Sequence, residues 1–86
     1  MIRVRAWLTG IDIQGHACYA PAGEDIVCAA ASVLAFTLVD ICEGATITAE
    51  DGHICIEGGD VSAIRFARRG YELLAEQYPG HVEVSR

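Results

Sequence analysis

The chain has 86 residues, of which 52% are hydrophobic and 21% are charged, and its net charge is −6. This length predicts one domain over residues 1–86, and the dispersed basic residues exclude the concentrated positive charge of a typical nucleic-acid binder. An acidic surface favours a basic peptide or protein segment as partner. The high hydrophobic fraction indicates that a second copy of the chain covers some apolar surface.

The N-terminal sequence "MIRVRAWLTG" lacks the pattern of a secretory signal, which predicts a cytoplasmic protein. The longest apolar run, residues 26–41, is too short for a membrane span. The chain contains no CxxC pair, and in a protein without a signal we expect reduced thiols rather than disulfides. The four cysteines are Cys18, Cys28, Cys42 and Cys55.

The first part of the chain alternates between apolar and polar residues. Residues 2–8 have the period of a half-buried strand, with Leu8 on the apolar face, and Thr9-Gly10 is a turn signal. The alternation resumes over residues 11–15. These segments predict a short hairpin.

A loop and a helix follow this hairpin. Residues 15–24 contain two glycines and a proline with no sustained period, which predicts a loop. Asp25 is a candidate N-cap for a helix that ends before Gly44. The helix is apolar nearly all round, so we expect it to be covered on more than one side.

The second half repeats the order of the first. Two alternating segments, residues 45–50 and 53–57, flank an Asp51-Gly52 hairpin signal. Asp60 is the N-cap of a second helix, in which Gly70 marks a close crossing, and residues 81–85 form a last strand. The order ββαββαβ predicts an α+β domain with a mixed or antiparallel sheet packed with two helices.

Cys28 stands out because it falls in the first turn of the predicted helix. Unpaired amides and the helix dipole at this position favour the thiolate form of a cysteine. His16 lies at the end of a predicted strand, from which it can serve as general base and then as general acid. The pair therefore predicts a cysteine peptidase that needs no cofactor, although a cysteine in an alanine-rich helix is also a common core residue.

Several neighbouring residues have both a functional and a structural interpretation. Asp25 is a helix cap, an orienter of His16, or both, and as a cap it would occupy the Cys28 amide that an oxyanion needs. Ser32 lies one turn after Cys28, where it either shapes the site or bonds a carbonyl one turn back. Tyr19 and Phe36 are pocket walls or ordinary loop and core aromatics.

Two rival hypotheses compete with the peptidase. His16, Cys18 and Cys28 could hold a metal ion, although they lack the closely spaced pairs of structural zinc sites. Alternatively, the chain is a non-catalytic peptide-binding module. We interpret Cys42 and Cys55 as packing residues, and the remaining histidines, His53 and His81, as solvated residues on predicted strands.

The stretch "GHACYAPAGEDIVCAAAS", residues 15–32, resembles the signature of the ribosomal-processing cysteine protease family, called Prp. The shared elements are Gly-His-Ala, a short loop ending in glycine, and Asp-Ile-Val-Cys-Ala-Ala followed by a serine. The rest of the chain is similar in length and element order. The first hairpin departs from the family pattern because fewer residues precede Gly-His-Ala.

The resemblance implies a function and a set of site residues. His16 and Cys28 would form the catalytic dyad, supported by Asp25 and Ser32. A substrate loop would contain Gly15, Ala17, Tyr19 and Gly23. The family further implies a homodimer, no resident metal, and removal of the N-terminal extension of large-subunit ribosomal protein L-twenty-seven. In the light of this resemblance, the non-catalytic alternative is a ribosome-associated peptide-binding module.

Overall fold

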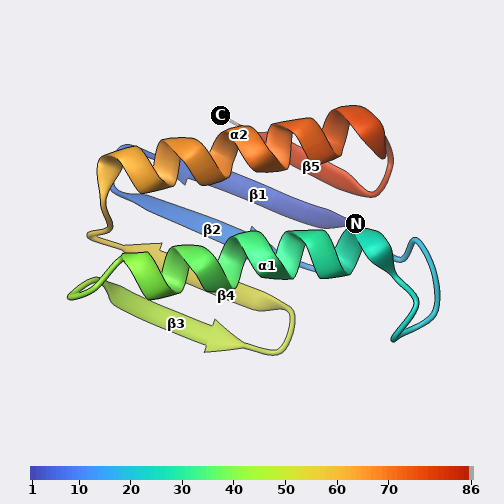
Figure 1. Cartoon of the computed structure of the whole chain (residues 1–86), viewed down its shortest axis with the longest axis horizontal. Coiled ribbons are helices and arrows are strands. Elements are labelled where there is room, and N and C mark those ends of the chain that lie inside the picture. The colour runs from blue at the N-terminus through green and yellow to red at the C-terminus, as the bar shows by residue number, and fades with distance from the viewer. Residues whose placement is uncertain (86) are drawn as a thin grey trace.

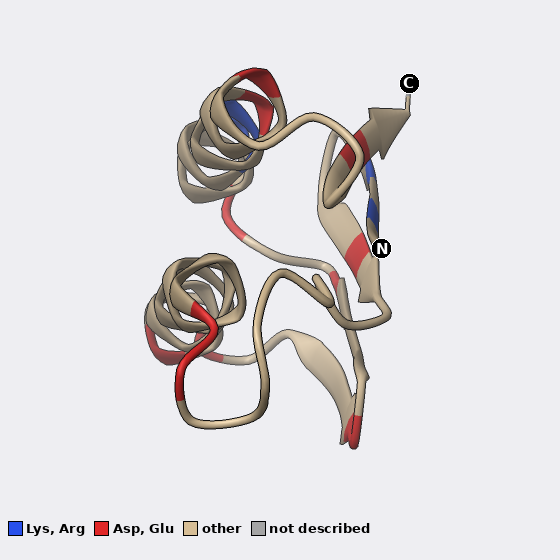
Figure 2. Ribbon diagram, turned by 90° about the vertical axis from the view of Figure 1, so that its right-hand side faces the viewer, with Lys and Arg blue, Asp and Glu red and all other residues tan. Residues whose placement is uncertain are grey.

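The computed structural model describes residues 1–85, which form two layers: a five-stranded sheet and a pair of helices. Both helices lie on the same face of the sheet, as Figure 1 and Figure 2 show. The predicted α+β order ββαββαβ is confirmed. The elements are β1 (Ile2–Trp7), β2 (Gly10–Gln14), α1 (Ile26–Ile41), β3 (Thr46–Glu50), β4 (His53–Glu57), α2 (Val61–Gln77) and β5 (Val82–Ser85).

The sheet has the strand order β3-β4-β2-β1-β5 and is mixed. The two hairpins and the β2–β4 pair are antiparallel, whereas β1 and β5 run parallel. Strand β2 therefore lies at the centre of the sheet, and its C-terminal end leads directly into the loop that carries His16. The register places Gln14 opposite His53, so β4 begins beside the C-terminal end of β2.

Both helices begin at the aspartates that the sequence indicates. The Asp25 side chain accepts a hydrogen bond from the Cys28 amide, and the Asp60 side chain accepts one from the Ala63 amide. Each bond satisfies a main-chain donor that the first helical turn leaves without an intrahelical partner. The prediction that these two residues are N-caps is confirmed.

The core lies between the helices and the sheet. Its largest fully buried side chains are Tyr71, Ile11, Ile56, Ile64, Val4 and Val27. The Tyr71 hydroxyl donates to the Ala31 carbonyl oxygen at 2.8 Å, which joins α2 to α1 and satisfies the polar atom of a buried ring. Burial raises the pKa of Tyr71 far above its usual value, so the hydroxyl stays protonated as a donor.

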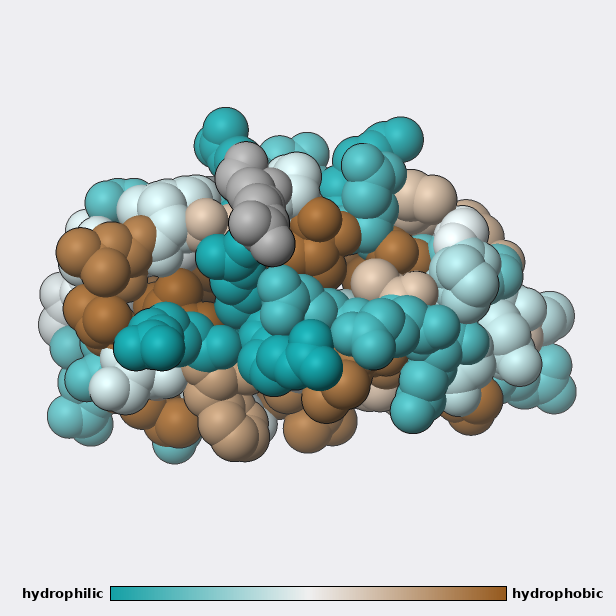
Figure 3. Space-filling view, turned by 90° about the horizontal axis from the view of Figure 1, so that it is seen from above, coloured by the Kyte–Doolittle hydropathy of each residue, from teal (hydrophilic) through white to brown (hydrophobic). Residues whose placement is uncertain are grey.

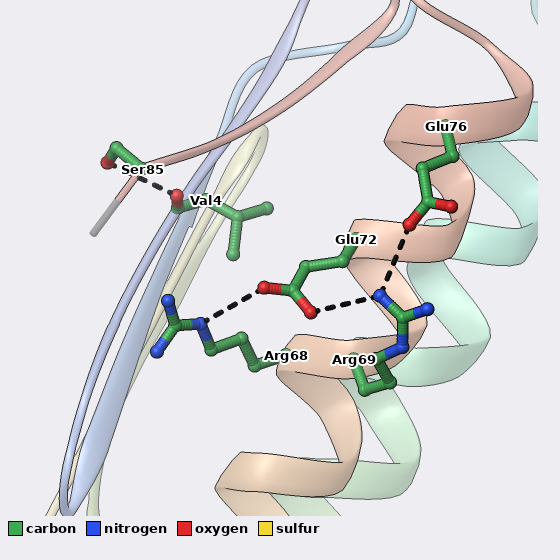
Figure 4. Close-up of polar contacts among 6 residues, drawn as sticks. All are labelled: Val4, Arg68, Arg69, Glu72, Glu76 and Ser85. Atoms are coloured by element: carbon green, nitrogen blue, oxygen red, sulfur yellow. Dashed lines mark hydrogen bonds and ion pairs between the residues drawn. The ribbon is translucent and has the colours of Figure 1, made fainter.

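The helices approach each other at Gly70, as predicted. A side chain at Gly70 would lie 2.9 Å from a methyl group of Leu34, so the absence of a β-carbon lets α1 and α2 pack closely. The opposite, solvent-facing side of α2 carries ion pairs that join Arg68 and Arg69 to Glu72, and Arg69 also to Glu76 (Figure 4). The amphipathic pattern of this helix thus matches its position.

One prediction of burial is wrong. Leu8 is 71% exposed, because β1 ends at Trp7 and the Trp7–Gly10 pair leaves Leu8 and Thr9 as the hairpin turn. The expectation that α1 is covered on more than one side stays a prediction, since within the single chain α1 buries one side, through Val27, Ala31, Ala35 and Leu38. Its outward residues Val33 and Phe36 are each 64% exposed.

The predicted bounds of the strands differ from the observed ones by a single residue at several ends. The prediction of solvated histidines is wrong, because His53 and His81 are half-buried and hydrogen-bonded. Cys42 is buried in the core, in agreement with a packing role. No helix within residues 1–85 combines the length and apolar character that crossing a bilayer requires.

Candidate active site

The site begins where β2 ends. Gly15 has a φ of +98°, and a β-carbon there would collide with the carbonyl oxygen of Met1. Its amide donates to the Gly52 carbonyl oxygen at 2.8 Å. These constraints require glycine, and they turn the chain out of the sheet so that the next residue, His16, is exposed.

Cys28 occupies the third position of α1, as predicted from the cap at Asp25. Its side chain is half-buried, and its sulfur accepts a hydrogen bond from the Ala17 amide at 3.2 Å. Ala17 itself is buried. The contact brings the residue after His16 directly onto the sulfur, although the two positions are eleven residues apart in sequence.

Asp25 holds the loop and the start of α1 together. One carboxylate oxygen accepts from the Cys28 amide at 2.9 Å, and the other accepts from the Tyr19 amide at 2.9 Å and the Ala20 amide at 3.3 Å. The bond from Cys28 is the main cause that lowers the pKa of Asp25, opposed by partial desolvation and assisted by the Tyr19 and Ala20 bonds. Asp25 is therefore a cap that also anchors the loop, and its observed partners are main-chain amides rather than His16.

Two cavities meet at His16, Cys28 and Ser32. The first, which we call the inner cavity, lies between α1 and the β3–β4 hairpin and has a volume of about 480 Å³. The second, the loop cavity, lies between the first turns of α1 and the loop through Cys18 and Gly23, and its volume is also about 480 Å³. His16 and Cys28 contribute to the walls of both, so the structure brings the predicted pair to one place.

The wall of the inner cavity between α1 and the hairpin is largely apolar, and Glu50, Asp51 and His53 border it near the turn. Ala31 and Ala35 of α1 face Ala49 and Ile54 of the hairpin, and Phe36 completes the wall. Small side chains on both sides leave a space that larger ones would fill. The alternative in which Phe36 is a core aromatic is wrong, since this side chain is largely exposed and borders the cavity.

The remaining predicted residues separate into two groups. Ser32 is exposed and borders both cavities, and no hydrogen bond within residues 1–85 joins its hydroxyl to a carbonyl one turn back. Gly23, with a φ of +88°, borders the loop cavity. Tyr19 instead packs edge-on against Tyr78 and His81, with ring centroids 5.3 Å apart in each pair.

Sequence reasoning missed the contacts that hold this loop from behind. The His81 ring nitrogen Nδ1 donates to the Ala17 carbonyl oxygen at 2.9 Å, so the connection between α2 and β5 supports the segment beside Cys28. Gly52 meets the chain at Gly15 from the other side. Neither residue carries a local pattern that indicates the site, since both contacts depend on how distant elements pack.

The metal-site hypothesis finds no support in the geometry. Within the described part of the chain, no group of three or more His, Cys, Asp or Glu side chains is placed to hold a metal ion. The four cysteines are free thiols. His16, Cys18 and Cys28 thus do not form a ligand set.

Comparison with known families identifies this arrangement. The model of a family described as cysteine protease Prp matches residues 1–83. The chain belongs to this family. The Prp assignment covers nearly the whole chain, confirms the resemblance of residues 15–32, and favours an enzyme over a non-catalytic binding module.

Solved structures agree with the Prp assignment. The chain is similar to the essential ribosomal processing protease Prp from S. aureus in complex with a covalently linked product peptide, with a TM-score of 0.89 and 25% identity over 99% of this chain and 98% of that chain. It is also similar to SMU.848 from Streptococcus mutans, with a TM-score of 0.75 and 25% identity over 99% and 92% of the two chains.

A second S. aureus Prp structure, in complex with a substrate peptide, shows the same fold, with a TM-score of 0.76 and 22% identity over 98% and 95% of the chains. The comparison with curated protein sequences finds no match. The family model thus establishes the family, and the solved structures establish the fold.

Proposed function

We propose that this Prp-family chain is a cytoplasmic ribosomal-processing peptidase that removes an N-terminal extension from large-subunit ribosomal protein L-twenty-seven, with Cys28 as nucleophile and His16 as general base and acid. The observation that carries the proposal is the meeting of His16 and Cys28 on the walls of two adjoining cavities. The likeness to S. aureus Prp, a ribosomal processing protease, supports the choice of substrate.

The proposed reaction proceeds by acyl transfer. The Cys28 sulfur attacks the carbonyl carbon of the scissile peptide bond after His16 has taken the thiol proton. The protonated imidazole then gives this proton to the leaving amine, which departs with the C-terminal part of the substrate. Water, deprotonated by His16, hydrolyses the thioester and returns Cys28 to its thiol form.

Main-chain geometry restricts which amide can stabilise the tetrahedral intermediate. The Cys28 amide is engaged by Asp25 at 2.9 Å, so it is not a free donor. The Ala17 amide lies 3.2 Å from the sulfur, next to the position that a carbonyl carbon bonded to this sulfur would occupy. We therefore assign the Ala17 amide as a donor to the oxyanion. In the intermediate, this amide would release the sulfur and donate its hydrogen bond to the negatively charged oxygen.

The two cavities suggest how a peptide lies in the site. Because they adjoin at Cys28, an extended segment that crosses from one to the other places a single peptide bond at the sulfur. The apolar inner cavity suits one large hydrophobic side chain beside the scissile bond. All five residues of the edge strand β3 are exposed, so its free edge is available for main-chain pairing with such a segment.

Charge at the mouth of the inner cavity favours a basic flank on the substrate. Glu50 and Asp51 border this cavity, both are exposed, and the whole chain has a net charge of −6. Carboxylates at the rim attract lysine or arginine side chains that remain outside the apolar cavity.

We also propose that the enzyme is a homodimer. Val33 of α1 and Phe66 and Leu73 of α2 are exposed, with 78% of Phe66 accessible in the single chain. A second copy that packs on the helices would remove these side chains from water. Sedimentation velocity should show a dimer that Phe66→Glu dissociates, and a parent protein that stays monomeric at all accessible concentrations would contradict this part of the proposal.

The central test uses extended ribosomal protein L-twenty-seven from the same organism and mass spectrometry of the products. The parent enzyme should yield one N-terminally trimmed species, whereas Cys28→Ala and His16→Ala should yield none. Cys55→Ser is the matched control, since Cys55 lies on β4 and borders neither cavity. Trimming by the Cys28→Ala variant would refute the assignment of the nucleophile.

Iodoacetamide labelling provides a second test that does not depend on the substrate. An activated Cys28 should react at mildly acidic pH faster than Cys18, Cys42 and Cys55. Cys18 is the informative comparison because it is exposed and borders the loop cavity. Equal labelling of Cys18 and Cys28 would mean that exposure alone determines their reactivity.

A further inference from the structure

The turn between β3 and β4 approaches the site from the side opposite α1. Strand pairing ends at Glu50 and His53, so the turn consists of Asp51 and Gly52, as the hairpin signal predicts. This turn lies at the same end of the molecule as the start of α1 (Figure 1). Asp51, Gly52 and His53 all border the inner cavity.

Two hydrogen bonds join this turn and the start of β4 to β2 and the residue that follows it. The Gly52 carbonyl oxygen accepts from the Gly15 amide at 2.8 Å. His53 Nε2 donates to the Asp12 carboxylate at 2.6 Å, on the opposite face of the sheet. The turn and the end of β2 therefore form one unit, and the position of Gly52 is set relative to the main chain of residue 15.

The His16 imidazole rests against Gly52. A β-carbon built on Gly52 would lie 3.0 Å from His16 Nε2, 3.6 Å from Cε1 and 3.7 Å from Cδ2. The first of these distances is tighter than ordinary van der Waals contact, so a β-carbon at residue 52 would push the imidazole by a few tenths of an ångström. Since His16 is otherwise exposed, this turn is a principal restraint on its ring.

We propose that Gly52 is a positioning residue for His16: its carbonyl oxygen holds the main chain at Gly15, and its missing side chain leaves room for the imidazole on the cavity wall that it shares with Cys28. This inference rests on the proposed function, in which His16 is the general base. It predicts that the β3–β4 turn takes part in catalysis although it contributes no reacting group.

A simpler explanation is that the turn needs glycine only for its main-chain conformation. Gly52 has a φ of +72°, which L-residues rarely adopt. Gly58 provides the matched control, because its φ is +78° and nothing lies within 4 Å of a β-carbon built there. An alanine at either position meets a similar main-chain strain, but only at residue 52 does it also meet the imidazole.

The experiment compares Gly52→Ala with Gly58→Ala in the full-length chain. Both should lower the melting temperature by a similar amount. Gly52→Ala should lower kcat about tenfold or more, because a displaced general base loses its alignment with the sulfur. Gly58→Ala should retain the parent kcat, and the KM of both variants should stay close to that of the parent.

Gly52→Asn and Gly58→Asn extend the comparison in case the alanine variants are poorly folded, since asparagine tolerates positive φ better than alanine. The rate of Cys28 alkylation against pH gives an independent measurement. The Gly52 variants should shift toward the His16→Ala profile, whereas the Gly58 variants should keep the parent profile.

The outcomes separate the failure of this inference from the failure of the proposed function. Equal kcat values and alkylation profiles for the Gly52 and Gly58 variants, with His16→Ala inactive, would overturn the positioning role alone. A change confined to KM would also overturn it, because it would assign Gly52 to substrate binding. Parent-like activity of His16→Ala would instead refute the proposed dyad.

Discussion

The two helices of this protein pack against the sheet in different ways. Helix α2 contacts β1, β2 and β5 and buries Ile64, Ala67 and Tyr71 almost completely. Helix α1 turns alanines toward β3 and β4, and a cavity of about 480 Å³ separates Ala31 and Ala35 from Ala49 and Ile54. The α2 side is thus filled at its centre, with a surface hollow of about 440 Å³ at its outer edge against β5, whereas the α1 side keeps a space that opens at Cys28.

The surfaces of the two sides differ as well. Along the edge formed by α2 and β5, a hydrophilic band runs across the middle and hydrophobic residues flank it (Figure 3). On the α1 side, the acidic residues Glu24 and Asp25 stand at the start of the helix (Figure 2). This contrast suggests a division of labour that variants can test: the α2 side should determine stability, and the α1 side should determine the proposed activity.

The largest effect should follow from emptying the filled side. Tyr71→Ala removes a fully buried ring and should lower the free energy of unfolding by about 3–5 kcal/mol. Tyr71→Phe, which loses only the hydrogen bond to the Ala31 carbonyl, should cost about 1 kcal/mol. Urea titrations of both variants measure the difference, and a small cost for Tyr71→Ala would show that this side is not the stabilising one.

Filling the inner cavity on the α1 side should lower activity and leave stability nearly unchanged. Ala49→Leu places a larger side chain in the inner cavity, so cleavage should fall by about 10–200-fold while the melting temperature stays near that of the parent. Thr48→Leu is the control, because Thr48 pairs with Cys55 and its side chain lies on the other face of the sheet. Full activity of Ala49→Leu would mean that the substrate does not enter the inner cavity.

Acidification should weaken the unit that joins β2 to β4. Burial by itself raises the pKa of Asp12. Hydrogen bonds from His53 and Gln14 and the charges of His53 and Arg5 together lower the pKa by more than burial raises it, so the net shift is downward. A lowered pKa contributes stability that is present above the ordinary value of 3.8 and is lost as the pH falls through the folded-state value.

Asp12→Asn tests this contribution. It should lower the free energy of unfolding at neutral pH by about 1 kcal/mol, because the pair is partly exposed. It should also make the free energy of unfolding depend less steeply on pH below 3.8, the ordinary pKa of an aspartate. Urea titrations at neutral and acidic pH provide both numbers, and parallel pH dependence of parent and variant would contradict the prediction.

Removing the loop anchor should affect motion more than overall stability. In Asp25→Ala, the amides of Tyr19, Ala20 and Cys28 lose their common acceptor and should exchange with solvent faster. Asp60→Ala, which removes the corresponding cap of α2, is the control and should leave these amides unaffected. Hydrogen exchange followed by NMR distinguishes the two variants.

The smallest effect belongs to the surface of the filled side. Arg69 is exposed and pairs with Glu72 and Glu76, so Arg69→Ala should leave the melting temperature unchanged within error. Calorimetry at low and high salt checks this result. A clear destabilisation would indicate that the ion pairs on α2, and not only its buried face, hold this side together.

The sequence predicts most of the fold because local signals and the final packing agree. Asp25 and Asp60 cap helices whose apolar residues recur at helical spacing, and Asp51-Gly52 joins two alternating segments. Leu8 shows where such reasoning fails, because the apolar–polar alternation of the sequence continues to Leu8 although the strand ends at Trp7. The strand order depends on pairing between distant segments, which no local pattern contains.

The candidate site was predictable in its members but only partly in its contacts. The motif around His16 and Cys28 identifies the pair, and the cap at Asp25 places Cys28 in the first turn. The contact between Ala17 and the sulfur, the support from His81 and the turn at Gly52 all depend on tertiary packing. The packing of Tyr19 against Tyr78 and His81 likewise depends on the connection between α2 and β5, and it agrees with the interpretation of Tyr19 as an ordinary loop aromatic.

The shared carboxylate of Asp25 separates the loop tip from the sulfur. Since Tyr19 and Ala20 bind one oxygen and Cys28 binds the other, Asp25 closes the segment between these amides into a loop. Ala22 and Gly23 at the tip border the loop cavity and take no part in these bonds. We therefore expect substitutions at the tip to change the shape of this cavity while the Cys28 sulfur keeps its place.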